Sequence, residues 1–241
     1  YEGAPAGAAA LAAVASKGAL ALALLRLAAE GDGAAPLWAF GLAAMGAVSI
    51  LLGNLLALMQ TSLPRMLGWS SVAHSGFLAA ILASGAPLSG QAALFYLAAY
   101  GPALLAAFCV AAALGPNPRL DDLRGLARAN PLAGGAFALA MLSLAGLPIA
   151  SGFLAKLYMV GALAQAERWA LLGVALVGSG VGLFYYARFL LAAVAPAGGA
   201  ARPAPAFGAA DRALLLVSAA LIAGLGVYPT PFIDLAVGLL R

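Results

Sequence analysis

The chain has 241 residues, of which 65% are hydrophobic and 8% are charged, and it carries a formal net charge of +4. Soluble domains carry about 25% charged residues, so this composition excludes a water-soluble domain and indicates a helical protein that crosses the membrane several times. The single cysteine and single histidine exclude a disulfide framework, a cysteine-ligated iron–sulfur cluster and a multi-histidine metal site, and the small net charge argues against nucleic acid as a partner.

Apolar stretches separated by polar loops predict the elements in chain order. The first predicted span covers about residues 5–29 and ends at the acidic, glycine-rich loop Glu30–Gly33. Further spans are predicted at about 36–60, 66–84, 91–114, 170–194 and 214–228. The centre of the polar loop at 115–130 predicts a short amphipathic helix on the membrane surface, and the tail at 231–241 is predicted to lie at the interface. Because Tyr1 is not an initiator methionine, we expect the chain to begin inside a longer protein.

The apolar stretch from Pro131 to Ala166 decides the topology, because a continuous helix of that length would measure about 54 Å against a hydrocarbon core of roughly 30 Å. It is interrupted by GLPIASG, at residues 146–152, and forms either two short spans or one broken span. A single passage puts seven arginines on one side of the membrane and three on the other, whereas two passages give six against four. The seven are Arg65, Arg119, Arg124, Arg128, Arg188, Arg202 and Arg212. We therefore expect one discontinuous helix, seven spans, and a cytoplasmic side that holds this arginine-rich end.

Lys17 lies in the middle of the first predicted span, where an ammonium group costs roughly 2.5–3.5 kcal/mol. It either pairs with an acid on a neighbouring helix or takes part in a proton or ion path. No acidic residue of this chain is expected at that depth, which favours the functional interpretation.

Lys156 follows the GLPIASG break, and broken helices at membrane depth are tolerated where their backbone is buried or lines a cavity. The alternative is that Lys156 extends to the outer interface. His74, about two turns into the third span, either transfers protons or only packs between helices. The three residues are predicted to form a proton relay, and no residue is assigned to a cofactor or a metal.

Other polar residues could hold water chains, although each is explained as well by a hydrogen bond between helices. They are Ser16, Gln60, Ser70, Ser71, Tyr96, Tyr100, Ser143, Ser151 and Tyr158. The pair Tyr185–Tyr186, near Arg188, is predicted to belong to the aromatic belt at the membrane interface.

Two segments carry a resemblance to a known family. These are LLGNLLALMQTSLPRMLGWSSVAHSGFLAAIL at 51–82 and MLSLAGLPIASGFLAKLYMV at 141–160, supported by YEGAP, ASK around Lys17, and GSGVGLFYYARFLL. They resemble the subunit N family of NADH-quinone oxidoreductase, the respiratory complex I. The resemblance covers essentially the whole chain. Subunits L and M and Mrp-type antiporter subunits share the architecture.

The resemblance implies an all-α, antiporter-like bundle of transmembrane helices with one discontinuous helix, corresponding to helices eight to fourteen of that family. It divides the chain into the last helix of a first repeat (1–30), a five-helix inverted-repeat unit with its break near 146–152 (31–195), and a final transmembrane helix with an interfacial tail (196–241). Lys17 matches the family's connecting lysine and Lys156 the lysine that passes protons outward. The implied function is proton translocation coupled to NADH:quinone electron transfer.

The resemblance also implies a setting for the chain. It would lie in the bacterial inner membrane beside a subunit M-like protein and small membrane subunits such as K and J. NAD, FMN, iron–sulfur clusters and quinone would bind to partner subunits, and this chain would hold no cofactor. The alternatives are a cation/proton antiporter subunit of the Mrp type and a purely structural module whose lysines only form ion pairs between helices.

Overall fold

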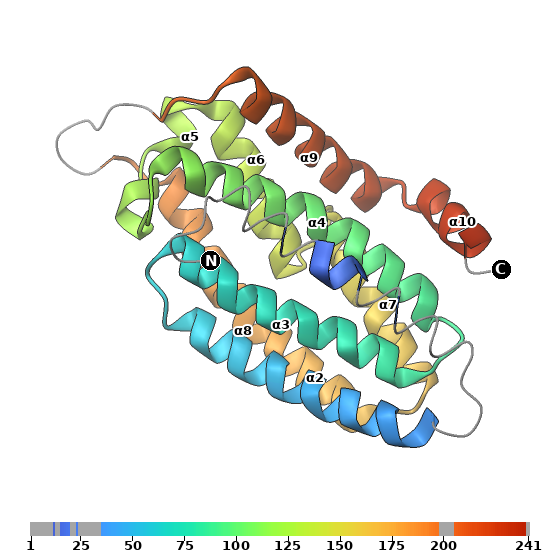
Figure 1. Cartoon of the computed structure of the whole chain (residues 1–241). Helices are drawn as coiled ribbons and strands as arrows, with labels where there is room; N and C mark the ends of the chain where they lie inside the picture. Colours follow the sequence, from blue (N-terminus) through green and yellow to red (C-terminus); the bar gives the residue numbers. More distant parts are fainter. Residues whose placement is uncertain (1–11, 13–14, 20–22, 24–34, 198–204, 240–241) are drawn as a thin grey trace.

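The computed structural model describes residues 12, 15–19, 23, 35–197 and 205–239, and Figure 1 draws the others as a thin grey trace. Most of the predicted first span and the acidic loop after it therefore lie outside the described residues. Residues 15–19 of that span are helical, as predicted. The proposed division at residues 30 and 195 stays a prediction.

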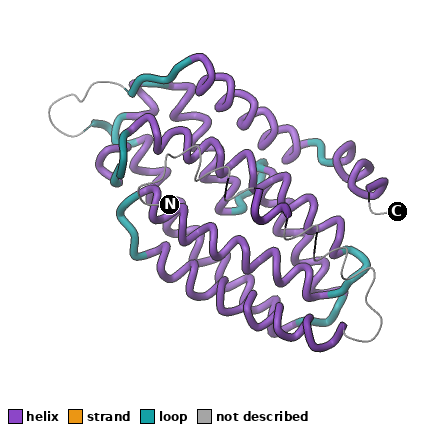
Figure 2. The backbone as a smooth tube through the Cα atoms, in the orientation of Figure 1, coloured by secondary structure: helices purple, strands orange, loops and turns teal. Residues whose placement is uncertain are grey.

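The described part of the chain is a bundle of helices, which confirms the predicted all-α fold (Figures 1 and 2). Its long helices are α2 (Ala35–Leu58), α3 (Leu63–Ser84), α4 (Ser89–Leu114), α8 (Trp169–Val194) and α9 (Ala209–Val227). Within the described residues, these five are long and apolar enough to cross a membrane. The shorter helices are α5 (Leu126–Ala129), α6 (Pro131–Ala145), α7 (Ser151–Gln165) and α10 (Thr230–Leu239), with a 3-10 turn at Leu120–Leu123. The chain is thus a multi-pass membrane protein.

Glycines bring α2 and α3 into backbone contact. A Cβ atom on Gly53 would lie 2.5 Å from the amide nitrogen of Ala73, and one on Gly76 would lie 2.7 Å from the carbonyl oxygen of Gly46. In a membrane, where burial of apolar surface does not drive helices together, such close approach supplies the packing contacts that hold a pair. The pair α2–α3 forms one side of the bundle (Figure 1).

Two loops are joined at the arginine-rich end of the bundle. The amide of Leu63 donates to the carbonyl of Pro118 at 2.8 Å, and the amide of Leu120 donates to that of Thr61 at 3.1 Å. These bonds tie the α2–α3 turn to the loop after α4. The amphipathic helix predicted in that loop is present as two short pieces, the 3-10 turn and α5, because Gly125 takes a left-handed conformation with φ 83° between them.

The helices α6 and α7 form one interrupted passage across the bundle. The amide of Gly125, just before α6, donates to the carbonyl of Ala195 after α8 at 2.8 Å. At the opposite end, the amide of Leu88 donates to the Gln165 side chain, the last residue of α7, at 3.3 Å. The start of α6 and the end of α7 therefore lie at opposite ends of the bundle, where Figure 1 also draws them. This confirms the single discontinuous helix predicted from the arginine distribution.

Local residues set where these elements begin and end. The Asn130 side chain accepts a hydrogen bond from the amide of Ala133 at 3.1 Å and caps the start of α6. The predicted start of α9 at 214 is five residues late, because Asp211 accepts from the amide of Gly208 at 2.9 Å and begins the helix at Ala209.

At its other end, α9 packs directly on the break between α6 and α7. A Cβ atom on Gly226 would lie 2.3 Å from the carbonyl oxygen of Ile149. Ile149 itself has a φ of 79°, a conformation that costs a β-branched residue strain.

Candidate functional site

His74 joins three helices through its two ring nitrogens. It lies on α3 and is buried, with Nδ1 2.8 Å from the hydroxyl of Tyr96 on α4 and Nε2 3.0 Å from the hydroxyl of Tyr186 on α8. The hydroxyl of Tyr186 is in turn hydrogen-bonded to that of Ser70. A buried imidazole with both nitrogens bonded to hydroxyl groups is held in a fixed orientation and can exchange protons at either end.

Lys17 lies beside the same group of residues. Its buried amine donates a hydrogen bond to the hydroxyl of Ser71 at 2.5 Å and sits 5.4 Å from the centre of the Tyr100 ring. The His74 ring packs against the same Tyr100 ring, with centroids 4.6 Å apart. Tyr100 therefore contacts both of the predicted titratable residues on this side of the site.

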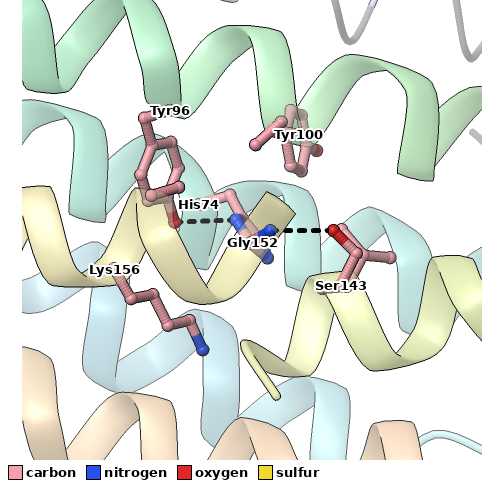
Figure 3. Close-up of a pocket in the computed structure, with 9 residues that line it drawn as sticks. His74, Tyr96, Tyr100, Ser143, Gly152 and Lys156 are labelled. Carbon is pink, nitrogen blue, oxygen red and sulfur yellow. Dashed lines mark hydrogen bonds between the residues drawn. The ribbon is translucent and has the colours of Figure 1, made fainter. Parts of the chain in front are cut away.

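The break between α6 and α7 exposes polar backbone inside the bundle. The hydroxyl of Ser143 accepts from the amide of Gly152 at 3.1 Å (Figure 3). The same hydroxyl lies 3.3 Å from that of Ser151. A Cβ atom on Gly152 would lie 1.8 Å from the carbonyl oxygen of Ser143, so only glycine fits where the two half-helices meet.

Lys156 turns back toward this break. Its amine donates to the carbonyl of Ala145 at 2.7 Å, and its side chain lies so close to Gly146 that a Cβ there would be 2.5 Å from the Lys156 Cδ. The amine is also 5.8 Å from the centre of the Phe77 ring. Lys156 thus points into the bundle, and the alternative in which it extends to the outer interface is wrong.

A small cavity connects these groups. The centre of a water molecule can occupy about 10 Å³ of it, which is about the space that one water needs. Its walls are His74, Tyr96, Ala99, Tyr100, Ser143, Leu144, Gly152, Ala155 and Lys156, most of which Figure 3 labels. His74 and Lys156 therefore face the same water-sized space from different helices.

The structure brings the three residues predicted as a proton relay into one connected region. Of the other polar residues weighed in the sequence, Ser70, Ser71, Tyr96, Tyr100, Ser143 and Ser151 belong to it. Ser16, Gln60 and Tyr158 make other contacts: the Ser16 and Gln60 side chains bond the backbone one turn earlier, and Tyr158 packs on Phe95.

The assignment of Tyr185 and Tyr186 to an interfacial aromatic belt is wrong. Both side chains are 1% exposed, and their rings pack together inside the bundle with centroids 4.4 Å apart. The hydroxyl of Tyr185 donates to the side-chain oxygen of Asn54 at 3.0 Å. Asn54, which sequence reasoning missed, is buried on α2. The sequence does contain a signal that Tyr186 faces the inside of the bundle. Gly178 and Gly182 precede Tyr186 at four-residue spacing and mark a closely packed face of α8.

Comparison with known proteins agrees with this architecture. A family model described as "NADH:quinone oxidoreductase/Mrp antiporter, TM" matches residues 1–182. NADH-quinone oxidoreductase subunit N of Rhodopseudomonas palustris is 54% identical over 95% of this chain and 50% of its own length. The corresponding protein of Cereibacter sphaeroides is 48% identical over 97% of this chain and 52% of its own length. The chain thus spans about half the length of the curated relatives it matches.

Solved structures give the same result. A chain of respiratory complex I from Thermus thermophilus with bound aureothin matches with 37% identity and a TM-score of 0.70, over 80% of this chain and 44% of that one. A chain of the archaeal membrane-bound sulfane sulfur reductase has the same fold, with 24% identity and a TM-score of 0.83 over 100% of this chain and 50% of that one. The bundle with its broken passage, the two lysines that point into it and the extent of the family match together show that this chain belongs to the NADH:quinone oxidoreductase/Mrp antiporter transmembrane family.

Proposed function

We propose that this chain is part of a proton-translocating membrane subunit of NADH-quinone oxidoreductase. The observation that carries the proposal is the placing of Lys17 and His74 against the same Tyr100 ring, with His74 also lining the cavity shared with Lys156. Amines, an imidazole and a water site placed within an apolar bundle are suited to passing protons, since each can accept and release one.

In this proposal Lys17 and Lys156 are the ends of the relay and His74 lies between them. A proton moves from Lys17 toward Lys156, which releases it to the outer side of the membrane. The break supports this role for Lys156, because the carbonyl of Ala145 holds its amine where the cavity can supply a water molecule. Residues Ser143 and Ser151 keep the exposed ends of the two half-helices polar.

The energy for translocation would come from partner subunits. The relatives at 54% and 48% identity are named NADH-quinone oxidoreductase subunit N, and a chain of an assembled complex I matches at 37% identity. We therefore expect this chain to work beside other membrane subunits, such as a subunit M-like protein and subunits K and J, in a bacterial inner membrane. NAD, FMN, iron–sulfur clusters and quinone would bind to the partners and not to this chain.

A cation/proton antiporter subunit of the Mrp type is the second candidate, because the matched family model includes both classes. A chain of the Mrp complex from Dietzia shares the fold, with 22% identity and a TM-score of 0.75 over 90% of this chain and 49% of that one. Co-purification separates the two candidates. A large assembly that oxidises NADH supports the first, and cation/proton exchange in vesicles without NADH oxidation supports the second.

The decisive experiment replaces Lys156 by alanine in the assembled complex and measures protons moved per NADH oxidised in inverted vesicles. We expect assembly to persist and proton transport to be lost, because Lys156 is the group that releases the proton. Arg168→Ala, which removes an exposed cation at the start of α8, is the matched control and should pump normally. Normal stoichiometry in the Lys156→Ala complex would refute the proposal and favour a purely structural role for the lysines.

A further inference from the structure

The hydrogen bonds around His74 constrain where its protons lie. A neutral imidazole has one N–H donor and one nitrogen acceptor. Both nitrogens face a tyrosine hydroxyl, so one tyrosine must donate to His74 and the other must accept from it. The series of hydrogen bonds Tyr96–His74–Tyr186–Ser70 therefore has a direction from donor to acceptor, and the hydrogens can be arranged in only two ways.

The two ends of this chain differ. In one direction Tyr96 donates to Nδ1, Nε2–H donates to Tyr186, and Tyr186 donates to Ser70. A serine hydroxyl within a helix can in general donate onward to a carbonyl of the preceding turn. In the other direction Nδ1–H donates to Tyr96, whose own hydrogen then needs a new acceptor. Within the described residues the Tyr96 hydroxyl bonds His74 alone. An unpaired buried hydroxyl costs about 1–3 kcal/mol, so this second direction needs a water molecule or the Lys156 amine in the cavity as acceptor. Without such an acceptor, neutral His74 carries its proton on Nε2.

Protonation of His74 changes this arrangement at Tyr96. An imidazolium donates from both nitrogens, so Tyr96 must accept from Nδ1 and turn its own hydrogen elsewhere. Tyr96 lines the cavity that Lys156 also lines. The hydrogen of Tyr96 can therefore turn toward a water molecule or the Lys156 amine in that cavity, whereas the Tyr186 end leads to Ser70, away from the cavity.

We propose that Tyr96 is the group that passes protons between His74 and the water-sized cavity beside Lys156, and that Tyr186 is a positioning residue that keeps the His74 proton on Nε2. This inference rests on the proposed proton translocation and deepens it. In one step the O–H bond of Tyr96 breaks as its proton moves to Nδ1, while a proton from a cavity water or from the Lys156 ammonium forms a new O–H bond. The net result is one proton gained by His74 and one lost by the cavity donor, and Tyr96 stays neutral. The reverse step moves a proton out.

The test is Tyr96→Phe in the assembled complex, which removes the hydroxyl and keeps the ring. Protons moved per NADH should fall at least tenfold, with assembly retained. Tyr158→Phe is the matched control, because it removes a tyrosine hydroxyl from α7 whose ring packs on Phe95 outside the relay, and it should pump as the wild type does. Unchanged pumping in Tyr96→Phe would overturn the inference.

Two further variants separate this inference from the proposed function. His74→Gln and Lys156→Ala are measured in the same vesicles. If they lose pumping and Tyr96→Phe keeps it, the relay through Tyr96 is wrong and the proposed function stands. If all three keep pumping, the proposed function itself is wrong.

A spectroscopic measurement distinguishes a relay from a purely structural role. The complex is labelled with ¹⁵N-histidine, and the spectrum of His74→Gln is subtracted to isolate His74. We expect protonated Nε2 and hydrogen-bonded Nδ1 in the wild type, and a downfield shift of Nδ1 in Tyr96→Phe. A wild-type signal with the proton on Nδ1 would overturn the inference. If Tyr96→Phe does not assemble, 3,5-difluorotyrosine at position 96 keeps the hydroxyl but alters its acidity, and an unchanged pumping rate would count against the relay.

Discussion

The amine of Lys156 donates to the carbonyl oxygen of Ala145 at 2.7 Å, so the cation of one half-helix lies on the C-terminus of the other. The C-terminus of a helix carries partial negative charge, and a cation near it is stabilised. The break thus has two effects: it frees backbone carbonyls inside the membrane, and it places one of them where a buried ammonium needs an acceptor. A continuous helix would leave the Lys156 amine without that carbonyl.

Gly146→Ala should displace Lys156. Gly146 has a φ of 80°, which costs alanine about 1–2 kcal/mol, and the new Cβ would lie 2.5 Å from the Lys156 Cδ. We expect lower thermal stability of the complex and fewer protons per NADH. Gly135→Ala, on the same half-helix with open space at its Cβ, is the control and should match the wild type or exceed it in stability. Equal pumping by both variants would show that the position of Lys156 is not critical.

Ser71→Ala should slow proton transfer at the Lys17 end of the proposed relay. The Ser71 hydroxyl accepts the hydrogen bond of the Lys17 amine, and a bond to a charged group contributes about 1.5–3 kcal/mol. We expect the pumping rate to fall about tenfold, measured in vesicles with NADH. Ser75→Ala is the matched control, because within the described residues the Ser75 hydroxyl bonds the backbone carbonyl of Ser71. Equal rates in the two variants would contradict a role for the Lys17–Ser71 contact.

Gly53→Ala should separate α2 from α3. Its Cβ would lie 2.5 Å from the Ala73 backbone nitrogen, and backbone cannot move aside as a flexible side chain can. Overpacking of this kind costs about 1–3 kcal/mol, so denaturant should unfold the variant at lower concentration. Gly41→Ala, on the same helix with open space around it, should stay within about 0.5 kcal/mol of the wild type. A stable Gly53→Ala protein would show that the two backbones are not in contact.

The Asn54–Tyr185 hydrogen bond should be measurable as a coupling between α2 and α8. Asn54→Leu leaves the buried hydroxyl of Tyr185 without its acceptor, which costs about 1–3 kcal/mol. Tyr185→Phe in the Asn54→Leu background removes that hydroxyl and should restore part of the loss. A double-mutant cycle on the free energy of unfolding should give a coupling of at least about 0.5 kcal/mol. Strict additivity would mean that the bond contributes nothing.

The single passage of α6 and α7 predicts which loops share a side of the membrane. In a Cys109→Ser background, cysteine placed at Pro116 and at Arg168 should react with an impermeant maleimide from opposite sides, because these exposed residues lie at opposite ends of the bundle. The arginine distribution predicts that position 116 is cytoplasmic. Labelling of both positions from one side would exclude a single passage.

The elements could largely be read from the sequence, because their boundaries are local. The GLPIASG interruption gave the break, and the arginine distribution gave its single passage, which the bond from Gly125 to Ala195 confirms. Lys17 and Lys156 could be identified because a charge deep in hydrocarbon is costly wherever it lies.

The partners of those residues could not be read from the sequence. Tyr186 is 112 residues from His74, and their contact depends on how α8 rotates against α3. That rotation is set by packing at Gly178 and Gly182, where a Cβ would meet Ile50 at 2.3 Å and Asn54 at 3.3 Å, respectively. The position of Tyr185 and Tyr186 near Arg188 predicts a place at the membrane interface. Close packing of α8 instead buries both rings inside the bundle.

The glycine contact between α9 and the break has a mechanical consequence. Most of the surface of α9 faces away from the rest of the bundle, yet Gly226 presses its backbone against the carbonyl of Ile149, three residues from Gly146. A force that a neighbouring protein or the surrounding lipid applies to α9 is therefore transmitted to the break. The carbonyl that accepts from the Lys156 amine, that of Ala145, lies at this break. The outer helix α9 is in this way mechanically coupled to the break between α6 and α7.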